Sequence, residues 1–136
     1  MKRILFLCTH NSGRSQIAEA IVNRFHCDKF EARSAGTEPG TPNILVISAL
    51  EELGFDTSGM HSKHLDIFLD EKWDYVITLC DSANEGCPFF PGGKERIHHS
   101  FSDPSAFVGT EYEKRKQVMT LVEDIKKWFE QDFLGK

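Results

Sequence analysis

The stretch from Cys8 to Ser15 places the strongest constraint on how this chain folds. It reads Cys-Thr-His-Asn-Ser-Gly-Arg-Ser and follows directly after the apolar run Ile4-Leu5-Phe6-Leu7. A short apolar run bounded by a turn signal predicts a buried strand, here over residues 2–8, and the apolar spacing after Gly13 predicts a helix. A strand that turns into a helix can direct backbone N–H groups and the positive helix end at one anion. We call residues 8–15 the oxyanion loop.

The side chains of the oxyanion loop add chemistry to this backbone arrangement. The field of the loop favours thiolate over thiol at Cys8, which makes it a candidate nucleophile. The guanidinium of Arg14 is a planar fork of donors that fits two oxygens of a tetrahedral oxyanion. A cysteine that merely ends a core strand is the alternative, but it does not account for the glycine, arginine and serine at this spacing. The predicted oxyanion-binding residues are Thr9, His10, Asn11, Ser12, Gly13, Arg14 and Ser15.

Length, composition and charge limit the remaining possibilities. The 136 residues predict one domain, residues 1–136, and 40% apolar with 27% charged residues is ordinary for a globular protein. A net charge of −5 gives nucleic-acid binding no electrostatic support. The apolar run after Met1 is too short for a signal peptide, and no stretch approaches the length of a membrane span. We therefore expect a cytoplasmic protein without a membrane partner, and a monomer, because no apolar stripe is left unassigned.

The order of the predicted elements indicates the fold class. Further strands are expected at residues 30–34, 75–79 and 96–99, and helices at about 13–26, 43–53 and 111–133. This order predicts an α/β fold with a four-stranded parallel sheet and helices on both faces. The predicted core positions of the helices are Ile17, Ala18, Ile21, Val22 and Phe25 in the first, Ile44, Ile47 and Leu50 in the second, and Val118, Leu121, Val122, Ile125, Trp128 and Phe129 in the third.

Cys80 and Cys87 form a second group of candidate residues. Cys80 follows the predicted strand 75–79, so it opens onto the same sheet edge as Cys8 if the two strands are neighbours. In a helix, residues 80 and 87 would lie about 10.5 Å apart. A disulfide needs Cα atoms within roughly 7 Å. Since Gly86 and Pro88 weaken a helix, we predict that residues 80–92 change conformation between thiol and disulfide states.

Two other interpretations of these cysteines remain open. Cys80 could be an inert core residue with Cys87 as an exposed loop thiol. Alternatively, Cys80, Cys87, His98 and His99 could bind zinc, although their spacing matches no common zinc-ligand pattern.

Asp103, in the sequence Asp-Pro, is a candidate proton donor. It lies in a predicted loop after the fourth strand, and a carboxyl group near a thiolate can protonate an oxygen that leaves the bound anion. The alternative is that Asp103 only caps a turn before Pro104.

Together these residues make the chain similar to the thioredoxin-coupled arsenate reductases, a family with the low-molecular-weight tyrosine phosphatase fold. The resemblance covers essentially the whole chain. The matching positions are Cys8, Asn11, Arg14 and Ser15 in the loop, Ser34-Ala35-Gly36 in the turn after the second strand, Cys80 in Val-Ile-Thr-Leu-Cys, Cys87 in Gly-Cys-Pro, and Asp103 in Ser-Asp-Pro.

The resemblance implies a mechanism and a partner. Cys8 would attack arsenate held by Arg14 and the loop, while Asp103 protonates the departing oxygen. Cys80 would then attack the Cys8 sulfur and release arsenite, and Cys87 would attack Cys80. Thioredoxin, or another dithiol reductant, would reduce the resulting Cys80–Cys87 disulfide. The resemblance also implies that Ser15 donates a hydrogen bond to the Cys8 sulfur and that Asn11 holds the loop shape.

We expect no cofactor and no bound metal. Two other functions remain possible from the sequence. A low-molecular-weight tyrosine phosphatase would use the same loop and acid with water in place of the second cysteine. A non-enzymatic redox sensor would use the thiols to report oxidant to a partner.

Overall fold

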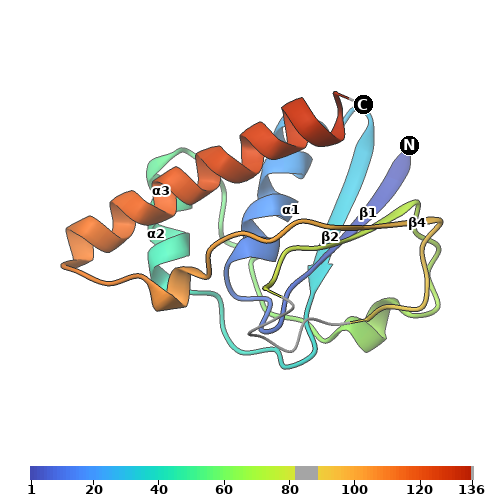
Figure 1. Ribbon diagram of the computed structural model, residues 1–136, viewed down its shortest axis with the longest axis horizontal. Coiled ribbons are helices and arrows are strands. Elements are labelled where there is room, and N and C mark those ends of the chain that lie inside the picture. Colours follow the sequence, from blue (N-terminus) through green and yellow to red (C-terminus); the bar gives the residue numbers. More distant parts are fainter. Residues whose placement is uncertain (82–88, 136) are drawn as a thin grey trace.

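The sheet is four-stranded and entirely parallel, as predicted. The computed structural model describes residues 1–81 and 89–135 (Figure 1). The strands are β1 (Lys2–Leu7), β2 (Phe30–Ala35), β3 (Tyr75–Thr78) and β4 (Glu95–His98), in the order β2-β1-β3-β4. Leu7 of β1 pairs with Thr78 of β3. The strands that precede Cys8 and Cys80 are therefore neighbours and end at the same edge.

One face of the sheet is covered by α1 (Arg14–Phe25), α2 (Ile44–Glu52) and α3 (Glu111–Lys127), with α3 running across the other two (Figure 1). These helices pack on Ile4 and Phe6 of β1 and on Ile77 of β3. The opposite face carries Leu5, Leu7 and Val76, which pack on the 3₁₀-helix η1 (Leu65–Phe68), Trp73 and Phe90. Both faces are covered as predicted, but in the described part of the chain only one of them carries α-helices.

The predicted core stripe of α2 is correct for Leu50 but wrong for Ile44 and Ile47, because the helix is rotated. Ile44 is 77% exposed and Ile47 is partly exposed, whereas Val46, Ala49 and Leu50 are buried. The Asn43 side chain caps the helix by accepting from the N–H groups of residues 45 and 46, which fixes where the helix begins. Because α2 packs against α3, the face at 46, 49 and 50 is the one that becomes buried.

Phe25 is also not the core residue that the spacing predicts. It is the last residue of α1 and is 45% exposed. Its ring makes an edge contact with Phe55, and the cations of Arg24 and Lys126 lie over its face. The aromatic ring is therefore partly covered at the surface and does not enter the core.

The C-terminal helix keeps its predicted buried face, but its last turns change type. After α3, residues Trp128–Phe133 form a π-helix, η3, in which both Trp128 and Phe129 are buried. The Leu134 N–H donates to the Phe129 carbonyl, an i→i+5 bond typical of this geometry. Within residues 1–81 and 89–135, no helix combines the length and the apolar character that a membrane crossing requires.

Candidate active site

The backbone of the oxyanion loop is oriented by its carbonyl groups. The carbonyl oxygens of residues 9–13 all accept hydrogen bonds from surrounding segments. The donors are the N–H groups of Glu38, Gly40, Asn43 and Ile17, the hydroxyl of Ser62 and the side-chain amide of Gln16. In a trans peptide the N–H points away from the carbonyl, and no cis peptide is present. The N–H groups of residues 10–14 therefore point to the side of the loop opposite these partners, where an anion can bind.

Asn11 holds the shape of the loop. Its φ of 51° lies in the left-handed region, which asparagine tolerates better than most residues. Its side-chain amide donates to Ser15 Oγ at 2.8 Å, and its Oδ1 accepts from the Lys63 N–H at 2.9 Å. Oδ1 also accepts from Gln16 Nε2 at 3.2 Å. The fully buried side chain thus joins the start of α1 to the segment around residue 63.

The Cys8 sulfur lies 2.9 Å from Ser15 Oγ, and Cys8 is only 2% exposed. Because Ser15 Oγ already accepts from Asn11, its own proton is available for the sulfur. The Ser15 hydroxyl can thus donate to the sulfur, and the N-cap residue of α1, Gly13, has no side chain to cap the helix, so the positive end of α1 is left open at the loop.

The side chains of Arg14, in the oxyanion loop, and Asp103 face each other. Arg14 is 4% exposed, and its Nη1 donates to the Phe101 carbonyl at 3.2 Å. Its Nη2 lies 3.9 Å from Asp103 Oδ2. The other carboxylate oxygen of Asp103 caps the short helix η2 (Pro104–Ala106) by accepting from the N–H and the hydroxyl of Ser105. Asp103 therefore caps a turn and also faces the guanidinium, so the two sequence interpretations are compatible.

The segment after β2 packs tightly against the oxyanion loop. An added Cβ at Gly36 would meet the Thr9 carbonyl oxygen at 2.4 Å, so this close approach requires glycine. The His10 Nδ1 is 2.9 Å from the Glu38 carbonyl oxygen, which turns the His10 ring toward this segment. The His10 side chain therefore holds the backbone of the segment after β2 at Glu38.

Cys80 lies just after β3 and is completely buried. The neighbouring Leu79 N–H donates to the Leu7 carbonyl at 2.9 Å, which places both cysteine-bearing chain segments at one sheet edge. Cys80 takes part in a disulfide bond, whereas Cys8 and Cys27 are free thiols. Cys87 lies outside the described residues, and so does the predicted conformational change of the segment that contains it.

The zinc interpretation finds no support in the described part of the chain. His98 hydrogen-bonds to hydroxyl groups through both ring nitrogens. Among residues 1–81 and 89–135, no three histidine, cysteine, aspartate or glutamate side chains gather as a metal-binding group.

Sequence reasoning missed the residues behind the loop: Gln16, Ser62 and Lys63. Lys63 Nζ donates to the His61 carbonyl at 2.9 Å and lies 4.0 Å from Glu19 Oε1. Burial lowers the pKa of Lys63 below its usual 10.5, Glu19 opposes this shift, and Arg33 adds to it. No local pattern marks Ser62 or Lys63, because both reach the loop only through the path of the chain after α2.

Comparisons with known proteins agree with this geometry. A family model described as low molecular weight phosphotyrosine protein phosphatase matches residues 3–131. An arsenate reductase of Halalkalibacterium halodurans is 42% identical over 113 residues, which are 83% of this chain and 81% of that protein. An arsenate reductase solved in the phosphate binding state is 30% identical, with a TM-score of 0.70 over 93% of this chain and 97% of that one.

A thioredoxin-dependent arsenate reductase of Corynebacterium glutamicum has a TM-score of 0.65 and 28% identity, over 100% of this chain and 64% of that one. The family match covers nearly the whole chain and includes the oxyanion loop, both strand ends and Asp103. The chain therefore belongs to the low molecular weight phosphotyrosine protein phosphatase family.

Proposed function

We propose that this protein reduces arsenate to arsenite with thiol electrons. The observation that carries the proposal is the oxyanion loop, in which the Cys8 sulfur and Ser15 Oγ are 2.9 Å apart and the loop carbonyls bond outward. Arsenate is a tetrahedral oxyanion that such a loop can bind through N–H groups and Arg14. Thr9 Oγ1, a buried hydroxyl without a hydrogen-bond partner among the described residues, is a further polar atom at the loop. The named relatives are arsenate reductases, which supports the choice of substrate.

The first step joins Cys8 to arsenic. The Cys8 thiolate attacks the arsenic atom, an As–O bond breaks, and the departing oxygen takes a proton and leaves as water. Asp103, whose carboxylate lies 3.9 Å from Arg14 Nη2, is the candidate donor of that proton. Arg14 holds the remaining oxygens, so charge is neutralised where it gathers.

The second step reduces the arsenic. The Cys80 thiolate attacks the Cys8 sulfur, an S–S bond forms, and the electron pair of the S–As bond stays on arsenic, which leaves as arsenite. Cys87 then attacks Cys80 and frees Cys8, and the Cys80–Cys87 disulfide is reduced by an external dithiol. Thioredoxin fits as that reductant, since one structural relative is thioredoxin-dependent.

Phosphate monoester hydrolysis is a second candidate function, because Cys8, Arg14 and Asp103 would serve it equally well. The two residues after Pro104 are Ser105 and Ala106, which are exposed and too small to grip an aromatic ring. We therefore expect at most a weak phosphatase activity.

Thiol counting tests the proposal. Reduced protein mixed with one equivalent of arsenate, without external reductant, is expected to lose two thiols per chain and release one arsenite. Cys8→Ser should lose none. When a dithiol reductant is then added, the natural chain should turn over repeatedly, whereas Cys87→Ser should stop after one cycle; a phosphatase would be insensitive to this change. Cys27→Ser is the matched control, since Cys27 is an exposed free thiol, and it should behave as the natural chain. Arsenate consumption by Cys8→Ser would overturn the proposal.

A further inference from the structure

The segment His98–Phe101 connects the two halves of the proposed thiol relay. The Phe101 carbonyl accepts from Arg14 Nη1 at 3.2 Å, and the Phe101 N–H donates to the Leu79 carbonyl at 3.1 Å. The Ser100 hydroxyl donates to the Cys80 carbonyl at 3.2 Å. One short stretch of chain therefore contacts both the anion-binding guanidinium and the peptide of the second cysteine.

The Ser100 side chain is itself held by a histidine. Thr78 Oγ1 is 2.7 Å from His98 Nδ1, and His98 Nε2 is 3.0 Å from Ser100 Oγ. A hydroxyl has one proton, and Ser100 gives it to the Cys80 carbonyl, so Ser100 must accept from a protonated Nε2. In the neutral ring Nδ1 then accepts from Thr78. The chain runs in one direction, from Thr78 through His98 and Ser100 to Cys80.

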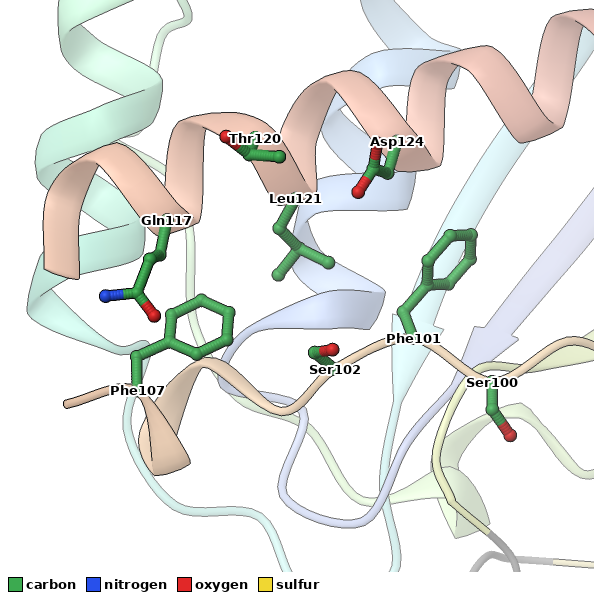
Figure 2. A pocket seen from close by; sticks show the side chains of 8 residues that line it. All are labelled: Ser100, Phe101, Ser102, Phe107, Gln117, Thr120, Leu121 and Asp124. Carbon is green, nitrogen blue, oxygen red and sulfur yellow. The ribbon is translucent and has the colours of Figure 1, made fainter. Parts of the chain in front are cut away.

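Figure 2 places Ser100 relative to its surroundings. The residues around it line a pocket of about 380 Å³ between this segment and α3, with Phe101 and Leu121 in its wall. The Ser100 hydroxyl points away from Leu121 and Asp124 on α3 (Figure 2). The hydrogen bond to the Cys80 carbonyl, and not a contact with Leu121 or Asp124, therefore explains the orientation of the Ser100 hydroxyl.

We propose that Thr78, His98 and Ser100 act as positioning residues that fix the Cys80 peptide relative to Arg14. This inference rests on the proposed function, in which Cys80 attacks the Cys8 sulfur. The N–H groups of His99 and Phe101 donate to the carbonyls of Thr78 and Leu79, which ties this segment to the chain just before Cys80. The Ser100 bond extends that support by one residue. It is made to the main chain of Cys80 and not to its sulfur.

The expected effect is moderate because Ser100 and His98 are exposed and water competes for their hydrogen bonds. Loss of one such bond corresponds to a change of about three- to tenfold in a rate. Positioning of a nucleophile affects the step in which it reacts and leaves the earlier binding of the anion unchanged.

Three variants test this inference in single-turnover experiments with reduced protein and varied arsenate. Ser100→Ala should slow the loss of two thiols about three- to tenfold, while the arsenate concentration for half-maximal rate stays the same. Ser100→Thr keeps the hydroxyl and should restore the rate. Ser102→Ala, two residues away and also exposed, should match the natural chain. A rate for Ser100→Ala equal to that of the natural chain would overturn the inference, and so would a loss confined to arsenate affinity.

Nitrogen NMR of the His98 ring gives a second, independent readout. The neutral ring should carry its proton on Nε2 in the natural chain, since Nδ1 accepts from Thr78 and Nε2 donates to Ser100; a proton on Nδ1 would contradict the inference. The natural chain also separates this inference from the proposed function. If arsenate removes no thiols from it, the proposed function fails. If it loses two and Ser100→Ala is equally fast, only the positioning inference fails.

Discussion

Asn11→Ala is expected to lower the free energy of unfolding by about 2–4 kcal/mol, a large effect for one side chain in a loop. Asn11 is fully buried, has a φ of 51° and hydrogen-bonds to the start of α1 and to the Lys63 peptide. The replacement removes the side-chain bonds and leaves an ordinary L-residue in a left-handed conformation.

The magnitude follows from what each former partner retains. In Asn11→Ala, Gln16 Nε2 still donates to the carbonyls of His61 and residue 11, and the Ser15 hydroxyl still hydrogen-bonds to the Cys8 sulfur. The Lys63 N–H loses the acceptor it has at 2.9 Å, and an unsatisfied buried donor costs about 1–3 kcal/mol. Alanine at this φ costs about 1 kcal/mol more.

Two variants separate the backbone cost from the side-chain cost. Asn11→Gly removes the same hydrogen bonds but fits the positive φ, so it should be more stable than Asn11→Ala by up to about 1 kcal/mol. Asn23→Ala is the matched control, because Asn23 also bridges two elements, donating to and accepting from the Ala32 peptide of β2 at 3.0 and 2.9 Å. It should reduce stability without disturbing the oxyanion loop.

Urea unfolding measures the stabilities, and the rate of Cys8 alkylation by iodoacetamide reports on the loop. Asn11→Ala should change the alkylation rate at neutral pH, since Ser15 loses the donor that directs its proton to the sulfur. The reasoning is refuted if the free energy of unfolding of Asn11→Ala lies within about 0.5 kcal/mol of that of the natural chain, which is the usual effect of a surface substitution. It is also refuted if Asn11→Gly is no more stable than Asn11→Ala.

Three other changes give further tests. Gly36→Ala should destabilise the protein by about 1–3 kcal/mol and impair anion binding, because the new Cβ meets loop backbone; Gly40→Ala, with nothing within 4 Å, should be neutral by thermal unfolding. Burial leaves the pKa of Lys63 below 10.5, so between its folded and unfolded pKa values only the unfolded state binds the proton. Stability of the natural chain relative to Lys63→Met should therefore rise as pH increases toward 10.5 in urea titrations. Burial raises the pKa of Glu130, but the hydrogen bond from His26 helps to bring the pKa below 4.5. The ionised Glu130 therefore contributes stability above pH 4.5 that is lost on acidification, and Glu130→Gln should lack this pH-dependent contribution.

Much of the architecture could be predicted from local sequence. The run Ile4–Leu7 followed by Gly13 and Arg14 gave the strand, the loop and the helix, since each depends on neighbours along the chain. The alternation of strands and helices was sufficient for a parallel sheet, because a right-handed crossover connects such strands. The chemistry of the loop was also readable, because nucleophile, donor and guanidinium lie within eight residues.

Helix rotation could not be predicted in the same way. Ile44 and Val46 are both apolar, and periodicity alone does not say which one faces the core. The packing of α3 against α2 decides it, and that contact joins residues far apart in the sequence.

The amino-acid sequence by itself predicted the strand, the loop with Cys8 and Arg14, and the helix that follows, because these depend on residue types at fixed short spacing. Only the tertiary structure decided what holds that loop open. Its carbonyls are occupied by the segments at residues 38–43 and 62, its asparagine by the Lys63 peptide, and its arginine by the Phe101 carbonyl. Each of these partners is a backbone or hydroxyl group that almost any sequence could supply, so its identity is set by position in space and leaves no signature along the chain.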